Sequence, residues 1–109
     1  AIDSRNPKLL HILREMYANI EEPLLLEELA ESAGVSRRHM ERMFTKALGE
    51  APASTYRKIK LDKARALLAE TDLSVIDVAA ATGFSSASIL TRHYKARYGE
   101  TPYGKSRKI

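Results

Sequence analysis

Apolar residues recur every three or four positions along most of the chain, which is the spacing of helices with one buried face. The first stripe consists of Leu9, Ile12, Leu13, Met16, Tyr17 and Ile20. Read in the same way, the chain predicts six helices. The first carries this stripe, has Pro7 near its start and is ended by Glu22–Pro23, and the others lie at residues 26–33, 37–48, 52–70, 75–82 and 87–98. No stretch alternates apolar and polar residues for long enough to predict a strand.

Residues that favour helix ends stand at the ends of these segments. Ser36 is placed to cap the third helix, and Gly49 follows that helix where a left-handed residue is common. Ser74 and Asp77 have the spacing of a capping box at the start of the fifth helix. The inner face of the third helix is predicted to be Met40, Met43, Phe44 and Ala47.

The chain contains an internal repeat of a short helix, a glycine turn, a longer helix and a final glycine and proline. Leu29–Ala30, Gly34, Val35 and Ser36 return 49 residues later as Val78–Ala79, Gly83, Phe84 and Ser85. Phe44, Gly49 and Pro52 return 50 residues later as Tyr94, Gly99 and Pro102. Two helices joined by a short turn with glycine are typical of a helix-turn-helix, whose second helix enters the major groove of DNA.

The second helix of each repeat carries polar side chains opposite its apolar stripe. They are Arg38, Glu41, Arg42 and Thr45 in the first repeat, and Ser88, Thr91, Arg92 and Lys95 in the second. An arginine fork matches guanine and phosphate oxygens, and a glutamate can accept a hydrogen bond from cytosine N4. These faces predict DNA binding by helices 37–48 and 87–98. The alternative is a helical protein-interaction module that binds an acidic partner with the same basic faces.

Charge is unevenly distributed along the chain. Residues 1–50 hold seven Lys and Arg against nine Asp and Glu, whereas residues 51–109 hold eleven against five. Basic residues cluster at 37–46, 57–65 and 92–108, which favours a polyanionic partner. The segment from Glu15 to Glu31 has six glutamates and no Lys or Arg, and we expect it to face away from that partner.

Composition excludes several other classes of protein. The absence of cysteine excludes disulfides, thiolate zinc sites and cysteine nucleophiles. No apolar run approaches the length that a membrane span needs. The three histidines are scattered, and residues 99–106 match the P-loop string without the preceding strand that such a loop requires. We therefore expect no enzyme activity, no metal and no cofactor.

Taken together, these residues resemble the DNA-binding domain of AraC/XylS-type bacterial transcription regulators, over about residues 8–108. The first half of the resemblance is carried by Glu28–Ala30, Gly34–Arg38, Glu41–Phe44, Gly49 and Pro52. The remainder is carried by Leu61–Leu68, Val78–Ala79, Gly83–Ser86, Thr91–Arg92 and Gly99–Pro102. Residues 19–24 and 84–88 are closer to one branch, whose members carry an N-terminal glutamine-amidotransferase-like sensor domain. One departure is Leu25, which stands where the first unit usually has a Ser cap.

The resemblance implies an all-α fold of seven helices, with two homeodomain-like helix-turn-helix subdomains joined by a long linker helix. The expected boundaries are 1–51 for the first subdomain, 52–71 for the linker and 72–109 for the second subdomain. The implied function is sequence-specific binding of double-stranded DNA, as the output domain of a cytoplasmic, nucleoid-associated bacterial regulator. RNA polymerase and a missing N-terminal effector-sensing domain are further expected partners.

Site residues are carried over one by one from the resemblance. The base-reading positions are Arg38, Glu41 and Arg42 in the first unit and Ala87, Ser88, Thr91 and Arg92 in the second. The neighbouring positions Ser36, Arg37, Thr45, Lys46, Ser86 and Lys95 complete the candidate DNA interface. No residue of the chain is expected to be catalytic or to bind a metal.

Overall fold

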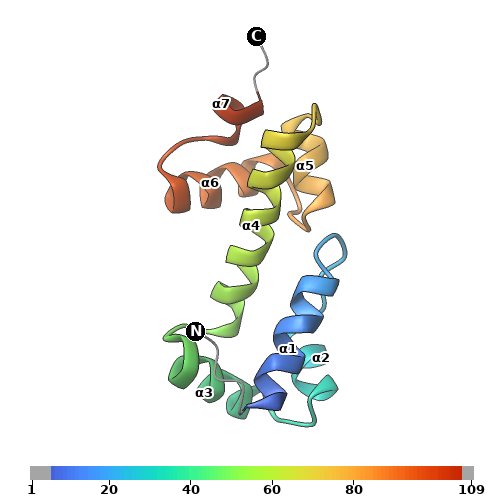
Figure 1. The fold of residues 1–109 in the computed structure, drawn as a ribbon, viewed down its shortest axis with the longest axis vertical. Coiled ribbons are helices and arrows are strands. Elements are labelled where there is room, and N and C mark those ends of the chain that lie inside the picture. Colours follow the sequence, from blue (N-terminus) through green and yellow to red (C-terminus); the bar gives the residue numbers. More distant parts are fainter. Residues whose placement is uncertain (1–5, 107–109) are drawn as a thin grey trace. The chain divides into compact units, whose positions relative to one another are not determined.

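The computed structural model describes residues 6–106, and every regular element in that range is an α-helix (Figure 1). The helices are α1 (Pro7–Ala18), α2 (Leu26–Ser32), α3 (Arg37–Leu48), α4 (Pro52–Glu70), α5 (Val75–Ala81), α6 (Ala87–Tyr98) and α7 (Pro102–Ser106). The predicted all-α fold of seven helices is confirmed. The bounds of α3, α4 and α6 agree with the predicted ranges to the residue.

The chain divides into two compact units. The first consists of Ala1–Asn19 and Pro23–Lys58, and the second of Ile20–Glu22 and Ile59–Ile109. The linker helix α4 is therefore shared, because its first residues belong to one unit and the rest belong to the other.

The core of the first unit is built from one face of each of its helices. Its fully buried side chains include Leu9, Ile12, Met16, Leu29, Met40 and Phe44. Tyr56 of α4 is buried beside them, and its hydroxyl donates a hydrogen bond to the Asn19 carbonyl and accepts one from the Leu24 amide at 3.1 Å. Burial raises the pKa of Tyr56 above 10.0. This hydroxyl therefore ties the segment after α1 to α4.

Two side chains predicted to be inside are outside. Tyr17 is 64% exposed, because it lies about 40° further round α1 than Leu13, the buried residue at the edge of the inner face. Ala47 is also exposed. It lines a hollow of about 990 Å³ between the first turn of α1 and the outer side of α3, so no helix covers it.

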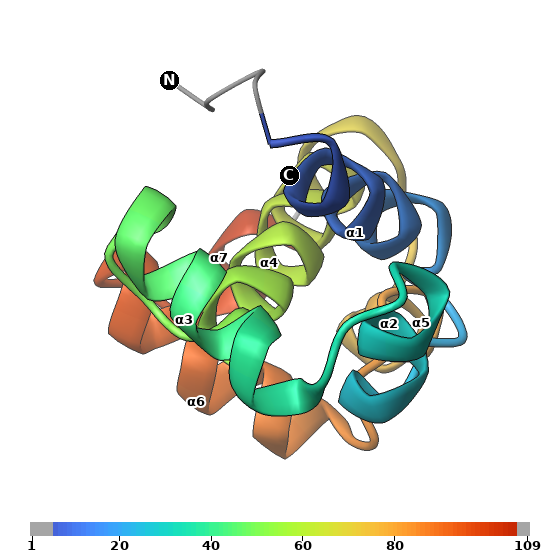
Figure 2. The same cartoon turned by 90° about the horizontal axis from the view of Figure 1, so that it is seen from below.

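Each unit contains a tight turn between its short and long helices, and Figure 2 shows the turn from α2 into α3. Gly34 has a φ of +69° and Gly83 a φ of +76°, a region that favours glycine. The residue after each glycine donates its amide back to the short helix, from Val35 to Ala30 at 3.0 Å and from Phe84 to Ala79 at 2.9 Å. The repeat in the sequence is thus a repeat in backbone conformation.

The second unit has its own core, in which α5 and α6 pack on the second part of α4. It contains Leu61, Ala64, Leu68, Val75, Val78, Ala79, Phe84, Leu90 and Tyr94. The predicted cap at Ser74 is present, since its hydroxyl accepts from the Asp77 amide at 3.1 Å. α5 ends one residue earlier than predicted, at Ala81, and the buried Thr82 hydroxyl donates to the Val78 carbonyl at 2.6 Å.

The start of α2 lacks a cap that the start of α5 has. Leu25 occupies the N-cap position, is 66% exposed and has no side-chain atom that can accept a hydrogen bond. We expect Leu25→Ser to raise the free energy of unfolding by about 0.5–1.5 kcal/mol, because the new hydroxyl can accept from the Glu28 amide. Thermal melting followed by circular dichroism measures the change. Ser74→Ala is the matched control and should lower stability by a similar amount, and a lower melting temperature for Leu25→Ser would contradict the prediction.

Tyr94 is completely buried, and within the described residues its hydroxyl has no hydrogen-bond partner. The equivalent residue in the first unit is Phe44, which fills its core without a hydroxyl. We expect Tyr94→Phe to raise the free energy of unfolding by about 1 kcal/mol, because a buried unpaired polar group is removed. Tyr98→Phe is the control and should lower the free energy of unfolding, since the Tyr98 hydroxyl donates a hydrogen bond to Asp62. Destabilisation by both substitutions in urea titrations would contradict this reading.

Candidate nucleic-acid interface

The first candidate reading helix, α3, is capped at both ends and has one buried side. The Ser36 hydroxyl accepts from the His39 amide at 3.0 Å, as predicted for an N-cap. At the other end Gly49 adopts a left-handed conformation with a φ of +74°. Met40 and Phe44 are buried on the inner side, so the opposite side of α3 is left to the polar residues.

That opposite side gathers five of the candidate residues around one shallow hollow of about 340 Å³. Its lining consists of Arg38, Glu41, Arg42, Thr45 and Lys46. All except Glu41 are exposed, and Glu41 is half-buried. The structure therefore brings together the reading face that the spacing predicts, with three cations around one carboxylate.

Glu41 is held in place by Arg37, the first residue of α3. Arg37 donates from Nη2 to Glu41 at 3.2 Å and from Nη1 to Glu27 of α2 at 3.0 Å. The Arg37 Nε is buried and has no partner within the described residues. Arg37 is a candidate interface residue, and its guanidinium already contacts two carboxylates of its own chain.

The candidate interface residues on α6 differ more from one another in exposure. The Ser86 hydroxyl caps the helix by accepting from the Ile89 amide at 3.1 Å. Ser88, Arg92 and Lys95 are exposed. Ala87 packs against the core of the second unit, and the Thr91 Oγ1 is buried without a partner within the described range. Arg92 and Lys95 are therefore the long polar side chains that this face presents.

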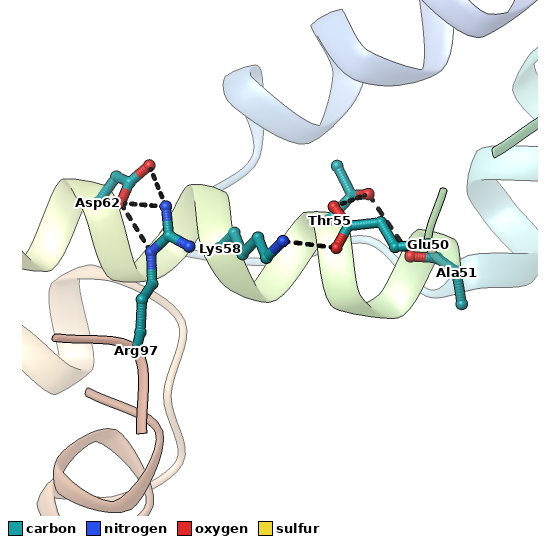
Figure 3. A network of polar contacts seen from close by, with 6 residues as sticks. All are labelled: Glu50, Ala51, Thr55, Lys58, Asp62 and Arg97. Carbon is teal, nitrogen blue, oxygen red and sulfur yellow. Dashed lines mark hydrogen bonds and ion pairs between the residues drawn. The ribbon is translucent and has the colours of Figure 1, made fainter. Parts of the chain in front are cut away.

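The C-terminal end of α6 is anchored to α4 by a polar cluster that sequence patterns do not reveal. Arg97 donates to Asp62 from Nε at 3.1 Å and from Nη2 at 3.3 Å, as Figure 3 shows. The Tyr98 hydroxyl also donates to Asp62, and burial followed by this bond raises the pKa of Tyr98 above 10.0. The pKa of Arg97 is raised above its ordinary value, first by its hydrogen bond with Tyr98. Because Asp62 and Arg97 are 35 residues apart in the sequence, no periodic pattern of residues indicates that they meet.

Several cations of the linker helix have partners within their own unit. Lys58 pairs with Glu50 at 2.7 Å in the first unit, a contact drawn in Figure 3. In the second unit, Lys60 lies over the Phe84 ring at 5.0 Å and Arg65 lies over the Tyr98 ring at 4.5 Å. Three cations of the basic cluster at 57–65 therefore have partners within the fold, and we expect the DNA contacts to lie mainly on α3 and α6.

The described part of the chain shows neither a metal-binding cluster nor a helix that could span a membrane. Residues 6–106 contain no group of three His, Asp or Glu side chains arranged to hold a metal ion. No helix in the same range is both long enough and apolar enough to cross a membrane.

Comparison with known proteins gives consistent matches. A family model described as a helix-turn-helix domain matches residues 29–107. The HTH-type transcriptional regulator CdhR of Pseudomonas aeruginosa is 45% identical over 97 residues, which are 89% of this chain and 29% of that protein. The HTH-type transcriptional regulator GlxA of Rhizobium meliloti is 40% identical over 99 residues, or 91% and 31% of the two chains. The chain thus spans under a third of the length of these curated relatives.

Solved structures with the same fold include two above 25% identity. A transcriptional regulator from Chromobacterium violaceum, described by its AraC-type DNA-binding domain, has a TM-score of 0.88 and 39% identity, covering 92% of this chain and 89% of that one. The DNA-binding domain of the global transcriptional factor AdpA, solved in complex with a target DNA, has a TM-score of 0.86 and 29% identity, covering 91% and 89%.

Proposed function

Since the chain belongs to the AraC-type helix-turn-helix DNA-binding domains of transcriptional regulators, we propose that it reads two adjacent major-groove segments of double-stranded DNA with α3 and α6. The domain is a DNA-binding module and not an enzyme. The residues proposed to contact DNA are Ser36, Arg37, Arg38, Glu41, Arg42, Thr45, Lys46, Ser86, Ala87, Ser88, Thr91, Arg92 and Lys95.

The observation that carries this proposal is the hollow on the outer face of α3. Arg38, Arg42 and Lys46 supply positive charge around it, and Glu41 supplies an acceptor for a base amino group. The equivalent helix of a relative at 29% identity belongs to a domain crystallised with its target DNA, which supports the same use of this face here.

The two helices are expected to contribute differently to DNA binding, because they present different side chains. α3 presents two arginines and a glutamate, which can discriminate between bases, whereas α6 presents one arginine and a lysine with a smaller serine. We expect α3 to supply most of the sequence specificity and α6 to supply affinity with weaker specificity.

Further partners belong to the full-length protein. Relatives more than three times as long as the matched segment support an additional domain, for which an N-terminal effector sensor is our proposal. RNA polymerase is the second proposed partner, and the cytoplasm, at the nucleoid, is the proposed location.

A gel shift with a salt titration tests the DNA-binding proposal. The domain is mixed with a random duplex pool and then with sites selected from it, at several salt concentrations. Groove binding predicts a steep linear fall of log affinity with log salt, because each phosphate contact releases counterions, and a selected site that is bound more tightly than the pool. Absence of a selected sequence, together with tight binding to an acidic protein, would support the protein-interaction alternative instead.

A further inference from the structure

The geometry points to Glu27 as a positioning residue for base reading by the first unit, acting through Arg37 on Glu41 without touching DNA itself. This inference rests on the proposed function of α3. Glu27 lies on α2, and its side chain is 67% exposed. Arg37 bridges the two carboxylates, with Nη1 on Glu27 at 3.0 Å and Nη2 on Glu41 at 3.2 Å.

The bridge compensates for an unfavourable local arrangement. Arg37 and Glu41 are four residues apart on α3 in the order base then acid, which is the weaker order for a helical pair. Arg37 also lies in the first turn of α3, where the helix dipole disfavours a positive charge. A second carboxylate from α2 offsets both effects, because it holds the other terminal nitrogen of the guanidinium.

Glu41 needs such a fixed neighbour if it reads a base. A carboxylate beside DNA is repelled by the phosphates, and a mobile one could take several rotamers. Arg37 neutralises Glu41 and fixes one of its oxygens, which leaves the other oxygen to accept from a base amino group.

The fold itself does not require this bridge, as the second unit demonstrates. The repeat places Ile76 at the position of Glu27, Ala87 at that of Arg37 and Thr91 at that of Glu41. None of these can form an ion pair, yet α5 and α6 form the same turn with the same kind of cap at Ser86. An exposed ion pair also contributes little to stability. The bridge therefore serves the reading face of the first unit and not its folding.

The test compares base preferences of four variants by selection from a randomised duplex pool. Glu41→Gln should flatten the preference at one base-pair position. Glu27→Gln should reduce the base preference at the same position about threefold to tenfold. This is within the range of coupling energies measured between residues of one hydrogen-bond network. The double variant should be no flatter than Glu41→Gln alone. Glu31→Gln, which removes the same charge from the same helix, is the matched control and should leave the profile unchanged.

Two further readouts separate positioning from damage. The melting temperature of Glu27→Gln should fall by less than about 4 °C. Arg37→Lys should reproduce the flattening, because one Nζ cannot span both carboxylates, and it serves as the second variant if Glu27→Gln folds poorly. An unchanged profile for Glu27→Gln beside a flattened one for Glu41→Gln would overturn this inference and leave the proposed function standing. Failure of the unmodified domain to select any sequence would instead overturn the proposed function.

Discussion

Replacing Arg42 with alanine is expected to weaken binding to a selected DNA site by about 1–3 kcal/mol, or fivefold to 150-fold, and to relax specificity at one or two base pairs. Arg42 is exposed on the outer face of α3 and lines the hollow beside Glu41. Within residues 6–106 it makes no ion pair, so its fork is available for a guanine edge. Fluorescence anisotropy on the selected site and on single-base variants measures both effects.

Two further substitutions show whether the loss comes from base reading. Arg14→Ala removes the same charge from an exposed position on α1 and should change affinity less than twofold. Lys46→Ala should weaken binding to all sequences about equally and reduce the salt dependence, as expected for a phosphate contact. If Arg42→Ala left the preference for every base pair intact, the assignment of this face would be wrong.

Arg92 is the equivalent arginine of the second unit, and Arg92→Ala is expected to cost an amount at the lower end of the same range. Its neighbours explain the smaller effect. Ala87 has no polar side-chain atom and the hydroxyl of Thr91 is buried, so neither offers a polar group to a base in this conformation. The Thr91 methyl group can still contact a thymine methyl.

The boundaries of the long helices could be predicted from the sequence because the signals that set them are local. Ser36 and the glycines after α3 and α6 act within four residues, and the apolar stripes have a fixed period. The grouping of the candidate interface residues on α3 followed from the same periodicity, since the residues opposite Phe44 must face outwards.

The partners of individual side chains could not be predicted in the same way. Arg37 meets Glu27 only because the turn at Gly34 returns α3 towards α2, and Asp62 meets Arg97 across 35 positions. The exposure of Ala47 likewise depends on where the neighbouring helix α1 begins. These features depend on tertiary packing, which a stripe of apolar residues does not specify.

Sites selected by the domain are expected to be asymmetric, with a strongly specified box for α3 and a weaker box for α6. Both units lie on one chain in the same order, and their faces differ. Arg38, Glu41 and Arg42 have no set of equivalents of the same chemistry on α6, where Ser88, Thr91 and Arg92 stand instead. Two unlike faces cannot read the two halves of one inverted repeat, so a single domain should occupy each site.

The expected loss of affinity differs between the two boxes, because α3 is expected to supply most of the sequence specificity. Scrambling the α3 box should reduce binding to the level of random DNA, a loss of about a thousandfold or more. Scrambling the α6 box should cost about tenfold, which corresponds to one mismatched base pair at the lower end of the usual range. Anisotropy titrations give both values, and the mass of the complex gives the number of domains bound. Recovery of a palindrome occupied by two domains would contradict the prediction of an asymmetric site read by a single domain.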